Sequence, residues 1–169
     1  HPFRLNPNLP PLGVDHVEYM KARYRDEAGI IAANEPVLRA AERLGLWINM
    51  ALIDRVPQTL DAFRLLHWAG IEGAQSRVMS GLMRAYWREG KNIADHQVLA
   101  DIGASAGMDG QMILRLLATD ADREEVLIRE AHARERGFRA VPTFIIGGAQ
   151  VVPGAQPAEL WKQVIDELA

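Results

Sequence analysis

The chain of 169 residues contains no cysteine. These residues therefore offer no thiol for a disulfide and no thiolate for a zinc or iron–sulfur site. Other metal ligands are not grouped either, because none of the five histidines has a second histidine or paired carboxylates near it at a metal-binding spacing. The sequence predicts no metal site and no resident cofactor.

Long apolar runs and an excess of positive charge are also missing. No stretch of about 18 consecutive apolar residues occurs, so the sequence contains no candidate for a membrane-spanning helix. The formal net charge is −3, which argues against nucleic-acid binding through clustered basic side chains. The first residues, His1–Leu5, lack the basic flank and apolar core of a signal peptide. We expect no nucleic-acid or membrane partner and a cytoplasmic location.

Hydrophobic residues make up 49% of the chain, enough for one domain with a substantial core. Asp15, Asp95 and Asp109 each precede apolar residues at helical spacing, so each is expected to cap a helix. Asn34, followed closely by Pro36, predicts another helix start. Further helices are expected over residues 58–68, 74–89 and 120–137.

The two ends of the sequence have strand-like patterns. Residues 2–6 are predicted to form a strand before a proline-rich turn, and residues 46–50 a second extended segment. Residues 143–146 and 150–152 predict a hairpin, with Gly147-Gly148 as a two-residue turn, and a final helix follows. Because a lone hairpin is barely stable, we expect it to share a sheet with residues 2–6. Three strands would still be few, which suggests a further strand from outside these residues.

The segment Ala140–Gly148 carries the most specific pattern. Pro142 has no N–H, so the N–H and C=O of Val141 are left to pair with another extended backbone, such as a peptide or glutathione. The segment resembles the signature before the final hairpin of thioredoxin-fold proteins, in which the proline follows a cis peptide bond. The resemblance implies a cis bond at Val141-Pro142, a catalytic role for Pro142, and substrate binding by Val141, Pro142 and Thr143.

Further segments resemble the FrnE-like branch of the DsbA family, in the same order along nearly the whole chain. They are Phe3–Pro7, Thr59–Leu65, Leu82–Trp87 with Gly90 and Ile93, and Gly154–Pro157. Two positions depart from the family pattern: Gln58 replaces an asparagine and Phe63 replaces a histidine. Since phenylalanine cannot relay protons or tune a thiol, a polar lining of the family's active site is in doubt here.

The resemblance implies an α/β fold, a thioredoxin-like sheet with a large all-helical insertion. Residues 1–14 and 136–169 would form the thioredoxin-like core, and residues 15–135 the helical insertion domain. The family's first strand and its redox helix, with Cys-x-x-Cys at the helix N-terminus, would lie before His1. Without those cysteines, we expect the 169 residues alone to be inactive in thiol–disulfide exchange.

The function implied is thiol–disulfide oxidoreduction or isomerisation, with a protein dithiol or disulfide, or a small thiol, as substrate. One alternative is a glutathione-dependent isomerase or transferase of the 2-hydroxychromene-2-carboxylate isomerase or kappa-class type, for which glutathione would be the cofactor. Another alternative is a redox-silent peptide-binding module. We also expect that an incomplete sheet favours pairing of two copies as a homodimer.

Overall fold

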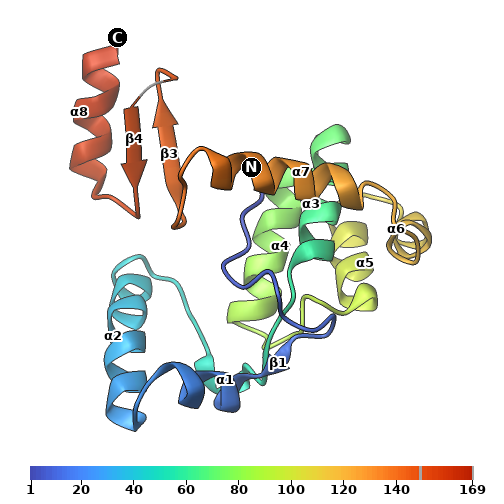
Figure 1. Ribbon diagram of the computed structural model, residues 1–169, viewed down its shortest axis with the longest axis horizontal. Helices are drawn as coiled ribbons and strands as arrows, with labels where there is room; N and C mark the ends of the chain where they lie inside the picture. The colour runs from blue at the N-terminus through green and yellow to red at the C-terminus, as the bar shows by residue number, and fades with distance from the viewer. Residues whose placement is uncertain (149, 169) are drawn as a thin grey trace.

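The computed structural model describes residues 1–148 and 150–168 and is rich in helices (Figure 1). The helices are α1 His16–Arg23, α2 Glu27–Arg43, α3 Leu60–Ile71, α4 Gln75–Trp87, α5 His96–Ser105, α6 Gly110–Leu117, α7 Arg123–Glu135 and α8 Ala158–Leu168, with a 3-10 turn at Met50–Leu52. The strands are β1 Val14–Asp15, β2 Arg55–Val56, β3 Thr143–Ile146 and β4 Gln150–Pro153. They form two separate antiparallel pairs, β1 with β2 and β3 with β4.

The core lies among α3, α4, α5 and α6. Helix α3 is its centre, because Leu65 and Ala69 are fully buried and meet Val78 of α4 and Leu99 of α5 in one cluster. Burial of each of these side chains, apart from the smaller alanine, contributes about 1.5–3 kcal/mol to folding. This buried cluster makes the bundle the stable part of the chain. Helix α7 packs along α3, and its Val126 is buried.

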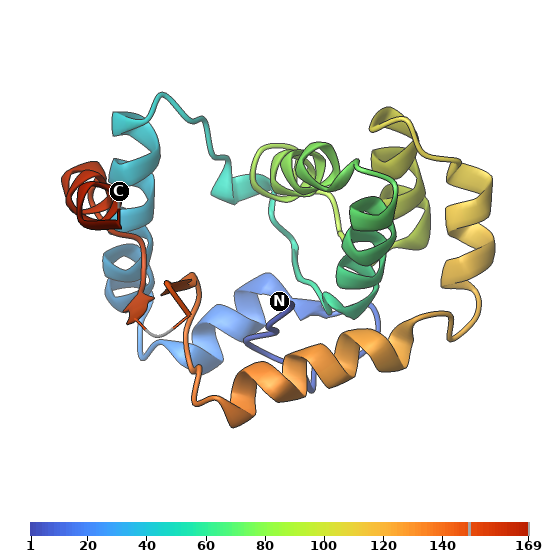
Figure 2. The same cartoon turned by 90° about the horizontal axis from the view of Figure 1, so that it is seen from above.

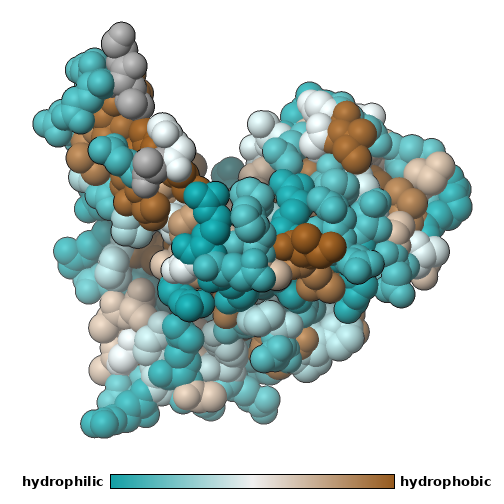
Figure 3. Space-filling view, turned by 45° about the horizontal axis from the view of Figure 1, so that its top comes forward, coloured by the Kyte–Doolittle hydropathy of each residue, from teal (hydrophilic) through white to brown (hydrophobic). Residues whose placement is uncertain are grey.

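Outside this bundle the chain forms two thinner arms. Helices α1 and α2 form one arm, in which α1 has no buried residue and α2 buries only Ala41. The hairpin β3–β4 and α8 form the other arm, which α7 joins to the bundle in both views (Figures 1 and 2). Figure 3 shows this second arm standing away from the helical body, with hydrophobic residues on its surface.

Several helix boundaries predicted from the sequence are confirmed. The carboxylates of Asp15, Asp95 and Asp109 accept hydrogen bonds from backbone N–H groups at the starts of α1, α5 and α6. The start at Asn34 is wrong, since α2 begins seven residues earlier at Glu27, where Asp26 caps it, and Pro36 lies inside the helix. The helix start favoured by Pro36 is not used, because the side chain of Asp26 caps the helix earlier in the chain.

The predicted three-stranded sheet is also wrong. Residues 2–6 form no strand, because the N–H of Arg4 donates to the carboxylate of Glu130 and its C=O accepts from Arg134. Within the described residues, the hairpin pairs only with itself. Residues 46–50 form no strand either. The register pairs Ile146 with Gln150, so three residues separate the strands rather than two, and the third of them, residue 149, lies outside the described residues.

Candidate functional site

The loop from α7 into β3 holds the residues that the sequence singled out. Gly137, with φ of +83°, ends α7, and the Val141-Pro142 peptide bond is cis, as the resemblance implied. The C=O of Pro142 accepts a hydrogen bond of 2.7 Å from the N–H of Gly154, and the Thr143 hydroxyl donates to the C=O of Ala140 at 2.7 Å. The loop is thus tied both to the end of β4 and to itself.

Val141 has free backbone groups in this loop. Within the described part of the chain, no hydrogen bond joins its N–H or C=O to another residue, and 46% of the residue is exposed. These groups are available for pairing with an extended backbone from another molecule. Binding of substrate by Val141, Pro142 and Thr143 stays a prediction.

The hairpin next to the loop carries apolar side chains on both faces. Phe144 and Ile145 are neighbours on β3 and therefore point to opposite faces, yet they are 41% and 38% exposed. Val151 on β4 is 52% exposed, and Trp161 of α8 packs edge-on to Phe144 with ring centroids 4.6 Å apart. Apolar surface therefore surrounds the Val141 loop and favours contact with apolar side chains of a substrate or of another chain segment.

A buried ion network fixes the helix that leads into this loop. Glu130 of α7 is 3% exposed, and its carboxylate accepts from Arg4 Nε at 2.7 Å and from Arg134 Nη2 at 2.7 Å. Burial raises the pKa of Glu130, but the hydrogen bonds from Arg134 and Arg4 outweigh it, so the pKa lies below its ordinary value. Arg134 also lies over the ring of Phe3. The first residues of the chain are thereby anchored to α7.

The two departures from the family pattern have structural roles. Gln58 donates from Nε2 to the C=O of Pro7 at 3.0 Å, and its Oε1 accepts from the N–H of Leu60 at 2.9 Å. It therefore holds the proline-rich turn against the start of α3. Phe63 packs against the apolar core cluster. The phenyl ring of Phe63 adds no polar group that could act on a substrate.

A second polar cluster, formed by Asp61, Arg64 and His96, was not found from the sequence. Asp61 accepts from Arg64 Nη1 at 2.8 Å and contacts His96 Nε2 at 2.8 Å. Burial raises the pKa of Asp61, but the hydrogen bonds from Arg64 and His96 lower it below its ordinary value. The spacing of three residues between Asp61 and Arg64 signals a helical ion pair, but no local signal brings in His96.

Arg64 is the centre of that cluster and is only 1% exposed. Its Nε donates to the C=O of Ala121 at 2.8 Å, and its Nη2 donates to the C=O groups of Leu116 and Thr119, each at 2.8 Å. Its guanidinium also lies 5.2 Å from the ring centroid of Trp68. Arg64 thus ties α3 to the turn between α6 and α7.

Over residues 1–148 and 150–168, no three histidine, aspartate or glutamate side chains gather where they could hold a metal ion. Over the same residues, no helix combines the length and apolar character needed to cross a membrane.

Comparison with known proteins places this geometry in context. Residues 1–166 match the DSBA-like thioredoxin domain. The uncharacterized protein YwbO of Bacillus subtilis is 29% identical over 168 residues, which cover 98% of this chain and 79% of YwbO. The crystal structure of the probable DsbA oxidoreductase SCO1869 from Streptomyces coelicolor is similar with a TM-score of 0.86 and 28% identity, over 98% of this chain and 72% of that one. The helix-rich structure thus has the DsbA-like thioredoxin fold with its helical insertion, and the chain belongs to the DSBA-like thioredoxin domain family.

Proposed function

We propose that this chain is the substrate-binding and helical part of a thiol–disulfide oxidoreductase of the DsbA type, FrnE-like branch, active in the cytoplasm. The observation that carries the proposal is the match to the DsbA-like domain along residues 1–166, together with the unpaired backbone of Val141 beside an apolar hairpin. The substrate would be a protein with a dithiol or disulfide, or a small thiol.

The chemistry requires two cysteines that these 169 residues do not contain. We place them in a Cys-x-x-Cys segment N-terminal to His1. In the reducing direction, the first thiolate attacks one sulfur of the substrate disulfide and forms a mixed disulfide, releasing the second substrate sulfur as a thiolate. The second enzyme thiolate then attacks the mixed disulfide. The substrate gains two electrons and two protons and leaves as a dithiol, while the enzyme pair is oxidised to a disulfide.

The residues present here would act on the substrate backbone rather than on its sulfur. The N–H and C=O of Val141 would pair with an extended segment beside the attacked disulfide, holding that segment in one register. The exposed faces of Phe144 and Val151 would contact apolar side chains of the same segment. This division of roles makes Val141 a positioning residue.

The proposal is tested with the product of the complete gene, its thiol content verified by intact mass and thiol titration. We expect insulin reduction in the presence of dithiothreitol and a trapped mixed disulfide when the second cysteine is replaced by serine. Pro142→Ala, which adds an N–H after Val141, should lower kcat/KM about 10-fold, or about 1.4 kcal/mol of transition-state stabilisation. Val141→Ala keeps the backbone groups and should change kcat/KM less than about 2-fold.

Other results would contradict the proposal in different ways. A single serine at the active-site position, with glutathione-dependent isomerisation and no insulin reduction, would establish the isomerase or transferase alternative. Peptide binding without any reactive thiol in the complete gene product would establish a redox-silent binding module. Equal kcat/KM for wild type and Pro142→Ala would remove the role assigned to the loop.

A further inference from the structure

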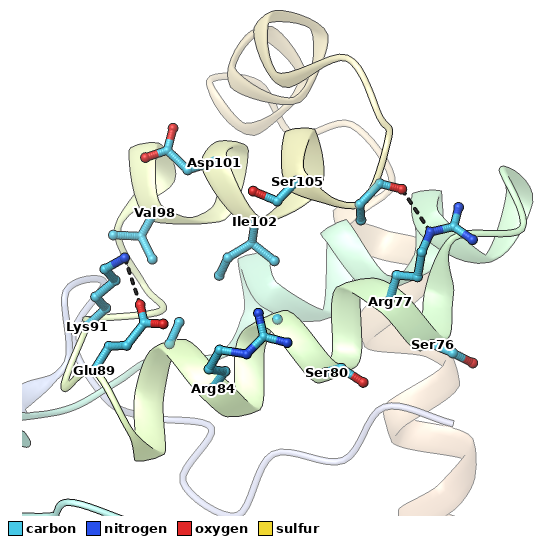
Figure 4. Close-up of a pocket in the computed structure, with 13 residues that line it drawn as sticks. Ser76, Arg77, Ser80, Arg84, Glu89, Lys91, Val98, Asp101, Ile102 and Ser105 are labelled. Carbon is cyan, nitrogen blue, oxygen red and sulfur yellow. Dashed lines mark hydrogen bonds and ion pairs between the residues drawn. The ribbon is translucent and has the colours of Figure 1, made fainter.

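A recess lies on the helical body, formed by residues other than those of the Val141 loop. It is a groove of about 590 Å³ between α4 and α5 (Figure 4). This volume falls within the range of sites that hold small organic molecules. The groove has no part in the proposed thiol chemistry.

The floor of the groove is built from small and apolar residues. Gly81 of α4 faces Ile102 of α5 so closely that a Cβ on Gly81 would lie 2.8 Å from Ile102 Cγ2. Ala85 and Val98 continue this floor. The close contact at Gly81 sets the depth of the groove and leaves an apolar surface on which a carbon skeleton can rest.

The rim of the groove is charged. Arg77, Arg84 and Lys91 line it together with Glu89 and Asp101. Most of these charges have partners: Lys91 pairs with Glu89 at 2.8 Å, and Asp101 accepts from Gln97 at 2.8 Å. Arg77 Nε donates to the C=O of Ala106 at 2.9 Å.

Arg84 differs from the other charged residues of the rim. Within the described residues, its guanidinium has neither an ion pair nor a hydrogen bond. Arg84 and Ser105 both line the groove, from opposite helices. Figure 4 shows the guanidinium beside α4 and the Ser105 hydroxyl on α5, with Ile102 between them in this view and the carboxylate of Asp101 pointing away. A guanidinium fork and a hydroxyl donor on the two walls of one groove can both donate to the oxygens of a phosphate group.

We propose that the α4–α5 groove binds a small organic phosphate. Arg84 and Ser105 donate hydrogen bonds to the phosphate oxygens, and the carbon skeleton lies on Ile102, Ala85 and Val98. The remaining N–H groups of Arg77 add positive potential at the end of the groove formed by the C-terminus of α5. A free phosphate ion shares the head-group chemistry but leaves the apolar floor unused.

The test is calorimetric titration of the full chain with phenyl phosphate, inorganic phosphate, benzoate and phenol. We expect saturable binding of phenyl phosphate, with inorganic phosphate binding about 10-fold more weakly because it leaves the floor uncovered. Arg84→Gln should weaken phenyl phosphate binding at least about 10-fold, since it removes a charge-assisted pair. Arg115→Gln, at an exposed arginine of α6 outside the groove, is the matched control and should change the Kd less than about 2-fold.

A second variant tests the site from the opposite helix. Ser105→Asp places a carboxylate opposite Arg84 and should abolish binding, while the far-UV circular dichroism stays unchanged because Ser105 is exposed. Absence of saturable phenyl phosphate binding, equal affinity in Arg84→Gln, or equal affinity for phenol or benzoate would each overturn the proposal. Failure here leaves the thiol assay untouched, so the two proposals fall separately.

Discussion

Replacement of Arg64 by methionine is the sharpest test of how this fold is held together. Methionine fills much of the same volume but removes the charge and every donor. The change deprives Asp61 of its buried cation and removes the Arg64 donor from the C=O groups of Thr119 and Ala121. The C=O of Leu116 also loses Arg64 but still accepts from the N–H and the hydroxyl of Thr119. It also removes the guanidinium from the face of Trp68, whose Nε1 donates to the carboxylate of Asp122.

The expected loss is set by the buried position of Arg64. Breaking a buried ion pair by removing one partner costs about 3–5 kcal/mol. Leu116 and Ala121 are half-buried residues and Thr119 is exposed, so we expect water to replace some of the lost hydrogen bonds and the loss to lie at the lower end, about 3 kcal/mol. With a slope near 2 kcal/mol per molar urea, the unfolding midpoint should fall by about 1.5 M.

The measurement is urea unfolding of the full chain, followed by tryptophan fluorescence. Arg39→Met is the matched control, because Arg39 pairs with Glu35 on the surface and both side chains are more than half exposed, at 68% and 54%. Its loss should be about 0.5 kcal/mol or less. A loss below about 1 kcal/mol for Arg64→Met would show that the buried contacts of Arg64 are not a main support of the fold.

Three further changes test other parts of the structure. The pKa values of Asp61 and Glu130 lie below their ordinary values of 3.8 and 4.5, so their contribution to stability is present above those values and should be lost as the pH falls through the lowered ones. The urea midpoint should therefore drop less between pH 6 and pH 3 in Glu130→Gln than in the wild type. The same dependence of the midpoint on pH in both proteins would contradict this. Burial raises the pKa of Tyr86 to about 12 from 10.0, so the tyrosine stabilises the fold below pH 10 and this contribution is lost as the pH rises toward 12. Tyr86→Phe should lose less stability over this alkaline range, measured by unfolding at each pH. Identical losses in the two proteins would disprove it. Gly90→Ala should destabilise the chain by more than about 2 kcal/mol in thermal unfolding, because φ is +65° and the new Cβ would collide with the backbone of the 3-10 turn. Gly45→Ala, with φ of +66° and open space around it, should cost only about 1 kcal/mol. Equal losses in the two variants would refute the collision.

Local signals in the sequence predicted much of the helical body. Asp95 and Asp109 cap their helices through their own side chains and adjacent N–H groups, so a few neighbouring residues suffice to recognise them. The final hairpin was equally local, since β-branched residues flank Gly147-Gly148. Its three-residue connection could not be predicted, because the register of a hairpin depends on the turn that the full connection adopts.

Long-range partners explain what the sequence could not predict. Residues 2–6 have a strand-like pattern, but Arg4 bonds to Glu130, 126 positions away, and no periodicity contains that information. Arg64 likewise gathers carbonyls more than 50 positions away. The cis bond at Val141-Pro142 was expected from family resemblance alone, because most bonds before proline are trans.

The anchoring of Arg4 on α7 has a mechanical consequence. One end of this helix leads directly into the Val141 loop, while its middle grips the opening residues of the chain. A rotation or slide of α7 would move the opening segment and the Val141 loop together. The distance between these two segments is therefore set by α7 alone. Any polypeptide joined ahead of His1 would begin beside α7, at a position fixed relative to Val141.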